Sequence, residues 1–477
     1  MKILALEAST SSAKAMLYET EDDTYETAQE AYPPSICSGG LTDTEAVFLC
    51  TARLGRQLAE GRSVSAVALC STWHSVTVCD RDMHPVTRTH NWNYMATESI
   101  CRRDRADRKL ADELYARTGC MPHVTYPRQM LRYMTEQGMD FSDKLTPTQG
   151  AYNFYRLTGE YLETVCNVSG SGLINLKSLD YDACALAYCG IGRSQLGRLC
   201  SFRDTLPLDE EGARLLGIEA GIPVVPAHAD GALNQIGDGA AAHGRMTVSV
   251  GTSGAVRFTA PRPMLPDSHA LWGYYGAADY MAGAATAGAC NCVNWYKDTY
   301  MKGMFSFGEL ESGAALPDDL PVFLPFLFGE RCPGWHDERL GGFVGVRPEH
   351  NLSDLYHAIQ QGVLFNLCQC YDELVRDIGA AERIVLSGGI LNSAAWTQLA
   401  ADIFRHEIEI STNPNASLMG AVVLGMHAAG AIDDIRTFEF PSAAHRRRVF
   451  PDPARAKVIR RQYERYLESY EMSTTRN

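Results

Sequence analysis

The stretch that decides the fold is ILALEASTSSAKAMLY at residues 3–18, because its pattern returns in the middle of the chain as MTVSVGTSGAVRF at residues 246–258. Each stretch has an apolar segment, a turn of small residues rich in Ser, Thr or Gly, and a second apolar segment. This pattern predicts a strand, a tight turn and a returning strand. The two stretches are separated by about half of the 477 residues. The sequence therefore predicts two similar domains, each beginning with such a hairpin.

Strand and helix patterns alternate along the rest of the chain, which indicates an α/β architecture. Apolar segments at residues 64–70 and 384–386 predict buried strands. The predicted helices are 353–377, 392–404 and 416–429, with a final amphipathic helix after Pro453. We place the domain boundary in the Gly- and Ala-rich stretch 231–244 and predict domains at residues 1–240 and 241–477.

Composition narrows the class of protein. The chain has 57 Asp and Glu against 43 Lys and Arg, a net charge of −14, so it repels nucleic acid. No apolar run approaches 18 residues, which rules out a transmembrane helix. Glu7 comes too early for a secretory signal peptide, and the 15 cysteines include no CxxC pair. We therefore expect a cytoplasmic protein with reduced thiols and no need for zinc.

Two kinds of turn could bind a nucleotide. Hydroxyl- and glycine-rich turns leave backbone N–H groups free to bind an anion, so two such hairpins facing each other would hold a polyphosphate. One alone would be an ordinary hairpin. The segment Ser387-Gly388-Gly389 lies between a predicted strand and a helix, where glycines let a ligand lie against the backbone. It is a candidate adenosine site.

Asp230 follows an apolar segment, on a tight turn at the predicted domain boundary. A carboxylate that faces an interdomain cleft can serve as a general base, because closure of the cleft excludes water. The alternative is an Asp with only a structural role in an Asp-Gly turn.

The order of these motifs resembles that of the FGGY carbohydrate kinases. The resemblance rests on Asp230-Gly231, the GTSG run at 251–254, the FGERCPGW run at 328–335 and the LSGG run at 386–389. The segments TGC at 118–120, LTGEY at 157–161 and GLINL at 172–176 are most similar to gluconokinase-type members. The resemblance implies two actin/hexokinase-like (ribonuclease H-like) domains with an interdomain cleft, and an ATP- and Mg²⁺-dependent sugar kinase.

The resemblance also implies roles for individual residues. Asp230 would accept the proton of the attacking sugar hydroxyl, and Glu7 would order waters of Mg²⁺. The residues expected to hold ATP are Thr10, Ser11, Ser12, Lys14, Gly251, Thr252, Ser253, Gly388, Gly389 and Ser393. The residues expected to contact the sugar are Trp73, His74, Trp92 and Asp230. Glu330 and Arg331 are expected to brace the cleft.

Three positions depart from the family pattern. Glu7 stands where the family has Asp, Ser9 where it has Gly, and Tyr94 where it has an Asp that binds sugar hydroxyls. Gluconate or a similar sugar acid or ketose is the favoured acceptor. Two alternatives stay open, a xylulokinase-like pentulose kinase and a non-catalytic sugar or nucleotide sensor. The sequence predicts a small-molecule sugar as partner, and it leaves a homodimer open.

Overall fold

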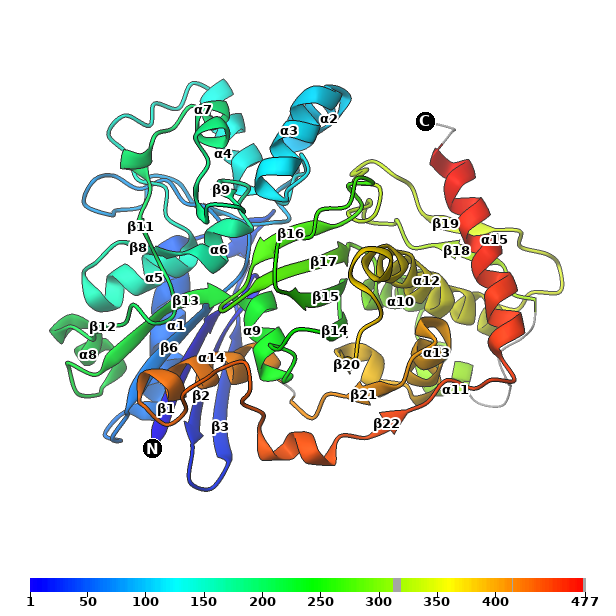
Figure 1. Ribbon diagram of the computed structural model, residues 1–477. Coiled ribbons are helices and arrows are strands. Elements are labelled where there is room, and N and C mark those ends of the chain that lie inside the picture. The colour runs from blue at the N-terminus through cyan, green and yellow to red at the C-terminus, as the bar shows by residue number, and fades with distance from the viewer. Residues whose placement is uncertain (312–318, 414, 475–477) are drawn as a thin grey trace.

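Two mixed sheets form the framework of the computed structural model, which describes residues 1–311, 319–413 and 415–474. The strand order is β12-β13-β6-β1-β2-β3 in the first sheet and β16-β17-β15-β14-β20-β21-β22 in the second. In each sheet, a central strand (β1 or β14) pairs antiparallel with the next strand and parallel with a later one (β6 or β20). The shared connectivity confirms the predicted duplication and the α/β class (Figure 1).

The bounds of the strands follow the two halves of the sequence. The first sheet consists of β1 (Lys2–Ala8), β2 (Ser12–Glu19), β3 (Thr24–Ala31), β6 (Ala66–Ser71), β12 (Leu206–Pro207) and β13 (Pro223–Ala229). The second consists of β14 (Arg245–Val250), β15 (Gly254–Ala260), β16 (Trp272–Tyr275), β17 (Tyr280–Thr286), β20 (Arg383–Ser387), β21 (Ile408–Ile410) and β22 (Arg448–Val449). A small three-stranded sheet consists of β4 (Cys37–Ser38), β5 (Leu41–Thr42) and β7 (Thr89–His90). The remaining strands form three pairs: β8 (Leu162–Thr164) with β11 (Arg198–Cys200), β9 (Ile174–Asn175) with β10 (Asp180–Tyr181), and β18 (Val322–Leu324) with β19 (Gly342–Val344).

The helices lie on both faces of the sheets and in the segments that connect the strands. In the first half they are α1 (Thr44–Ala59), α2 (Glu98–Ala106), α3 (Arg108–Thr118), α4 (Pro127–Glu136), α5 (Gln149–Thr158), α6 (Val165–Ser169), α7 (Ala183–Cys189), α8 (Glu210–Leu216) and α9 (Asp230–Gly237). In the second half they are α10 (Cys290–Tyr296), α11 (Phe307–Glu311), α12 (Leu352–Ile378), α13 (Ala394–Phe404), α14 (Ala416–Ala428) and α15 (Ala456–Thr474).

The central strand β1 is buried on both faces. Its residues alternate between two apolar cores: Leu4 and Leu6 pack with α1 and α5, and Ile3 and Ala5 pack with α14 on the opposite face. The helix α14 belongs to the second half of the sequence, yet it covers the first sheet. The chain therefore crosses back to the first domain after β21 and then returns to the second sheet with β22.

The helices α9 and α14 cross in direct backbone contact, near the centre of Figure 1. A Cβ atom on Gly237 of α9 would lie 2.0 Å from the carbonyl oxygen of Ala416, and one on Gly420 of α14 would lie 2.0 Å from that of Leu233. Only glycine fits at either position. The crossing fixes the N-terminus of α14 beside α9, at the place where the two sheets meet.

Most of the predicted helices are confirmed, with small shifts at their ends. The helix expected to begin at Ser353 begins at Leu352, because the side chain of Asn351 accepts hydrogen bonds from the N–H groups of Ser353 and Asp354. In return, Asp354 Oδ2 accepts from the N–H of Asn351, which completes a capping box. Neither Asn351 nor Asp354 was predicted to cap this helix.

Two observations on the described residues bear on the expectations from composition. None of their helices is both long and apolar enough to cross a membrane. All fifteen cysteines are present as free thiols, and most are buried. They pack as small apolar side chains, as expected.

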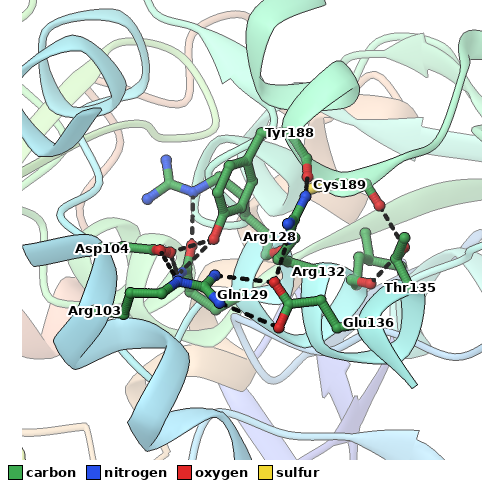
Figure 2. A network of polar contacts seen from close by, with 10 residues as sticks. Arg103, Asp104, Arg128, Gln129, Arg132, Thr135, Glu136, Tyr188 and Cys189 are labelled. Atoms are coloured by element: carbon green, nitrogen blue, oxygen red, sulfur yellow. Dashed lines mark hydrogen bonds and ion pairs between the residues drawn. The ribbon is translucent and has the colours of Figure 1, made fainter. Parts of the chain in front are cut away.

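Polar contacts join α2, α4 and α7, which lie at the upper left of Figure 1 and are drawn closely in Figure 2. Asp104, only 2% exposed, accepts a hydrogen bond from Gln129 Nε2 at 2.9 Å and another from the hydroxyl of Tyr188. At the surface of the same network, Glu136 pairs with Arg103 at 3.0 Å and with an arginine of its own helix. The network has a buried part and an exposed part.

We expect the two parts to contribute unequally to stability. Asp104→Ala leaves buried donors of Gln129 and Tyr188 without an acceptor, which should lower the free energy of unfolding by about 2–4 kcal/mol. Glu136→Ala removes only exposed ion pairs and should cost less than about 1 kcal/mol. Urea denaturation of both variants measures the difference, and equal losses would contradict this division.

Candidate active site

Two adjoining cavities are lined by residues from both halves of the chain. The inner cavity has a volume of about 260 Å³ and the outer cavity about 860 Å³. Asp230, Ser249 and Ser253 line both cavities. A group transferred from a ligand in the outer cavity to a ligand in the inner cavity would therefore pass these three side chains.

Asp230 lies at the end of β13 and is the first residue of α9, so the chain turns sharply beneath its side chain. Its Oδ1 accepts hydrogen bonds from the backbone N–H of Gly231 at 2.8 Å and of Trp73 at 3.3 Å. Burial, and then the negative charge of Glu7, raise the pKa of the Asp230 carboxyl, and Arg257 partly offsets this. The carboxylate is held by the backbone and is a stronger base than an exposed aspartate.

Glu7 lies behind the first hairpin and lines neither cavity. Its Oε1 accepts from Lys14 Nζ at 3.0 Å and from the hydroxyl of Ser9, and its Oε2 accepts from Ser417 Oγ at 2.6 Å. Ser9 replaces the family's glycine, and here its side chain helps to hold Glu7. Lys14 does reach the outer cavity, as expected of a residue that holds phosphate.

The hydroxyl residues of the first hairpin divide among different places. Thr10 lines the inner cavity, where its hydroxyl accepts a hydrogen bond from Trp92 Nε1 at 3.0 Å. Ser11 is exposed at the turn, and Ser12 is buried in β2. Neither of them lines the inner or the outer cavity. Of the four residues expected to hold phosphate on this hairpin, the structure brings only Lys14 to the outer cavity.

The second hairpin and the glycine turn after β20 meet at the outer cavity. Gly251, Thr252, Ser253, Gly388 and Gly389 all line it, as the sequence predicts. Gly388 has φ +98°, and a Cβ atom there would lie 2.5 Å from the carbonyl oxygen of Val250. The turn can approach β14 this closely only because it has no side chain.

Ser393 was also expected to bind the nucleotide, but it does not lie at the outer cavity beside this turn. Its hydroxyl caps α13 by accepting from the N–H of Trp396 at 3.0 Å, and it does not line the outer cavity. In its place Asn413 and Asn415, before α14, and Ser417, in its first turn, line the outer cavity. The sequence analysis recognised the helix at 416–429 but assigned no role to its start.

The inner cavity has aromatic walls. Trp73, Trp272 and Tyr274 line it, with Trp272 and Tyr274 stacked at 4.2 Å between ring centroids. Of the residues predicted to contact sugar, Trp73, His74 and Trp92 are all present. Tyr94, which replaces the family's sugar-binding Asp, does not line this cavity. Trp272 and Tyr274 belong to no motif that the sequence analysis used.

His74 is neutral in this setting. Its Nδ1 donates to the carbonyl oxygen of Gly170, because a carbonyl can only accept. Burial, and then the positive charge of Arg331, lower the pKa of His74 to about 3. With Nδ1 protonated, Nε2 is left as a hydrogen-bond acceptor that suits a sugar hydroxyl.

Glu330 and Arg331 have different surroundings, although both were expected to brace the cleft. Glu330 is buried, and it contacts Arg339 Nε at 3.2 Å and the hydroxyl of Tyr470 at 2.6 Å. Burial raises the pKa of Glu330 to about 7. Arg331 instead lines the inner cavity. The sequence analysis also missed Arg257, although an arginine within the apolar strand 254–260 is a signal that could have found it.

Contacts between the halves close the cleft around these cavities. Arg105 of α2 forms an ion pair with Asp337 at 2.8 Å, and His123 Nε2 lies 2.6 Å from the other oxygen of Asp337. The hydroxyl groups of Tyr126 and Tyr274 are 2.9 Å apart. The inner cavity is thus enclosed by both domains.

Comparison with known proteins agrees with this geometry. The model of the FGGY family of carbohydrate kinases matches residues 2–237 with its N-terminal domain and residues 246–429 with its C-terminal domain. The gluconokinase of Bacillus subtilis (strain 168) is 28% identical over 460 residues, with 90% of this chain and 88% of its own covered. The xylulose kinase of Escherichia coli (strain K12) is 27% identical over 406 residues, with 81% of each chain covered.

Solved structures extend the likeness of fold over the whole chain. A gluconate kinase from Lactobacillus acidophilus superposes with a TM-score of 0.92 at 24% identity, covering 99% of this chain and 98% of its own. A ligand-bound xylulose kinase from the same organism also has a TM-score of 0.92, at 23% identity, with 100% and 99% covered.

Gly388 offers a test of the outer cavity. Gly388→Ala should weaken ATP binding at least about tenfold, because the new Cβ forces the turn away from Val250. Gly379→Ala is the matched control: Gly379 has φ +92° and ψ 171°, close to the +98° and −170° of Gly388, but no atom lies within 4 Å of its Cβ position.

Calorimetric titration with an ATP analogue measures both variants. Both should lose some stability through the shared backbone strain, and only Gly388→Ala should lose affinity. Unchanged affinity in Gly388→Ala would contradict the placement of nucleotide against this turn.

Proposed function

The chain belongs to the FGGY family of carbohydrate kinases, and we propose that it transfers the γ-phosphoryl group of ATP to a hydroxyl of gluconate or a closely related sugar acid. Membership makes it an ATP-dependent sugar kinase, a phosphotransferase that acts on a sugar hydroxyl. The observation that carries the proposal is the position of Asp230, which lines the inner and the outer cavity at once.

Asp230 would act as the general base. The sugar lies in the inner cavity, its hydroxyl oxygen attacks the γ-phosphorus, and the bond to the leaving oxygen of ADP breaks in line with the new bond. The hydroxyl proton passes to Asp230. Hydrogen bonds from two backbone N–H groups fix Oδ1, so the carboxylate is oriented before the substrate arrives.

The outer cavity fits ATP. Its lining includes the glycine turn at Gly388, where any side chain would collide with β14, and the hydroxyl-rich turn at Thr252 and Ser253. Backbone N–H groups of such turns bind phosphate, and Lys14 would add a positive charge. With the phosphates held by these contacts, the γ-phosphate would lie next to Asp230.

Of the two carboxylates at this place, only Asp230 lines the outer cavity, where a divalent cation bound to the phosphates would lie. A carboxylate has about four acceptor positions. Glu7 uses three of them, for Ser9, Lys14 and Ser417, so one remains for a metal-bound water. Mg²⁺ bound to the phosphates would neutralise their charge during transfer. Glu7 would orient such a water, and Lys14 would hold Glu7 in place.

The choice of sugar rests on relatives and on the cavity. Gluconokinases of two Bacillus species are 28% and 27% identical to this chain over 90% of its length. A pentulose kinase is the second candidate, supported by the xylulose kinase of Escherichia coli at 27% identity. A cytoplasmic location is part of the proposal, in keeping with fifteen free thiols.

The role of Asp230 predicts a large and selective loss. Asp230→Asn should lower kcat by about 10²–10⁴-fold, the usual contribution of a general base, and leave ATP affinity nearly unchanged. Asp182→Asn is the control, because Asp182 is a buried aspartate that caps α7 and lines neither cavity. An ADP-release assay with gluconate measures turnover, and unchanged kcat in Asp230→Asn would refute the assignment.

The raised pKa of Asp230 predicts the acid side of the pH profile. Below this pKa the base is protonated, so kcat/KM falls as the pH decreases. The midpoint of this fall should lie above the value of about 3.9 for an exposed aspartate. Glu7→Gln removes a negative charge that raises the pKa of Asp230, and it should move the midpoint to lower pH.

Profiles of kcat/KM at saturating Mg²⁺ would measure both midpoints. Saturation separates the charge effect of Glu7 from its proposed part in holding the metal. A midpoint that stays in place in Glu7→Gln would contradict the coupling of these two carboxylates.

A further inference from the structure

The inner cavity contains more positive than negative charge. Among the described residues that line it, the charged side chains are Asp230, Arg257 and Arg331. His74 is neutral, for the reason given above. In a chain with a net charge of −14, a small cavity with two guanidinium groups and one carboxylate is a local reversal of sign.

Arg257 lies on β15 and shares the cavity-facing side of the strand with Ala255. Its Nη1 donates to Ser249 Oγ at 3.0 Å. No carboxylate of the described residues lies within the 4.0 Å of an ion pair with it. Burial lowers the pKa of Arg257, and the charge of Asp230 offsets only part of that effect. Arg257 is therefore half-buried, and no carboxylate of the described residues forms a direct ion pair with it.

Arg331 approaches the same cavity from the segment that follows β18. Its Nε is buried and has no hydrogen-bond partner among the described residues. Its guanidinium carbon lies 5.8 Å from the centre of the Trp92 ring. The neighbouring Glu330 gives it no ion pair, since that carboxylate contacts Arg339 and Tyr470 instead.

The two arginines act on one another across the cavity. The positive charge of Arg331 contributes to the lowered pKa of Arg257. Two half-buried cations that repel each other are costly unless an anion lies between them. The volume of about 260 Å³ leaves room for a small ligand only.

We propose that Arg257 and Arg331 bind the carboxylate of the substrate and so make an anionic sugar the preferred acceptor. This inference rests on the proposed function, whose sugar acid it explains at the level of single residues. Guanidinium groups present paired N–H donors that match a carboxylate. The aromatic walls at Trp73, Trp272 and Tyr274 exclude water and strengthen such a contact.

The excess of positive charge in the inner cavity also accounts for Tyr94, which stands where the family has an aspartate. An Asp in place of Tyr94, if it reached the cavity as in the family, would add a negative charge beside Arg331 and repel an anionic sugar. Here Tyr94 packs against His90 at 4.7 Å between ring centroids, outside the inner cavity. That aspartate would favour the binding of a neutral polyol, whereas its absence favours the binding of a sugar acid.

The test compares gluconate with glucitol, which has the same carbon chain with CH₂OH in place of the carboxylate. Arg257→Gln and Arg331→Gln should each raise the KM for gluconate at least about tenfold, the loss expected for charge-assisted hydrogen bonds. In each variant, kcat/KM should fall at least about tenfold more for gluconate than for glucitol, because only gluconate loses the charge-assisted hydrogen bonds. Arg262→Gln, an exposed arginine at the end of the same strand, is the control.

Thermal unfolding separates binding from misfolding. Because the two guanidinium groups repel each other, removing either charge should not lower the Tm of the free protein. Gluconate should raise the Tm of the unmodified protein and of Arg262→Gln, and not that of the two cavity variants. Absence of this difference would overturn the proposal.

Two kinetic outcomes would also overturn it. Equal losses of kcat on gluconate and glucitol, without a change in KM, would assign the arginines to the transferring phosphoryl group. If the unmodified protein preferred the neutral ketose xylulose, the proposal of an anionic substrate would fail. The proposed kinase activity itself would still stand.

Failure of the proposed function would look different. The unmodified protein would then transfer no phosphate to any of these sugars. Gluconate binding, measured by calorimetry without ATP, would still decide the matter: binding that both cavity variants lose supports the carboxylate site, and absence of binding rejects it.

Discussion

The crossing of α9 and α14 is the constraint on which the site depends. Gly237 and Gly420 let the two backbones touch, and any side chain there would separate them. The crossing fixes two helix starts: Asp230 begins α9, and Ser417, in the first turn of α14, donates to Glu7 of the first hairpin. Asp230, Glu7 and the boundary between the two cavities are therefore positioned together, although these residues come from distant parts of the chain.

In this acidic protein, individual carboxylates near the site are neutralised by neighbouring cations. Glu7 is neutralised by Lys14, and Asp337 by Arg105. The inner cavity is different, because Arg257 and Arg331 have no carboxylate partner among the residues that the structure describes. We therefore propose two anion sites in series: backbone N–H groups and Lys14 for phosphate in the outer cavity, and guanidinium groups in the inner one.

The sequence was sufficient for the fold because the duplication is visible in its hairpins, at residues 3–18 and 246–258. The predicted site residues Asp230, His74 and Gly388 all line one or both cavities, and their roles stay predictions. The sequence could not distinguish hydroxyls that face a cavity from one that caps a helix, as Ser393 does, or one buried in a strand, as Ser12 is. Nor could it pair Glu7 with Ser417, 410 residues away, since no local pattern records such a contact.

The most direct test is a crystal structure with gluconate and a non-hydrolysable ATP analogue. The account predicts the γ-phosphate at Ser253, a terminal sugar hydroxyl within ~3 Å of Asp230, and the carboxylate between Arg257 and Arg331. A sugar bound with no hydroxyl near Asp230, or a nucleotide bound away from the turn at Gly388, would contradict it.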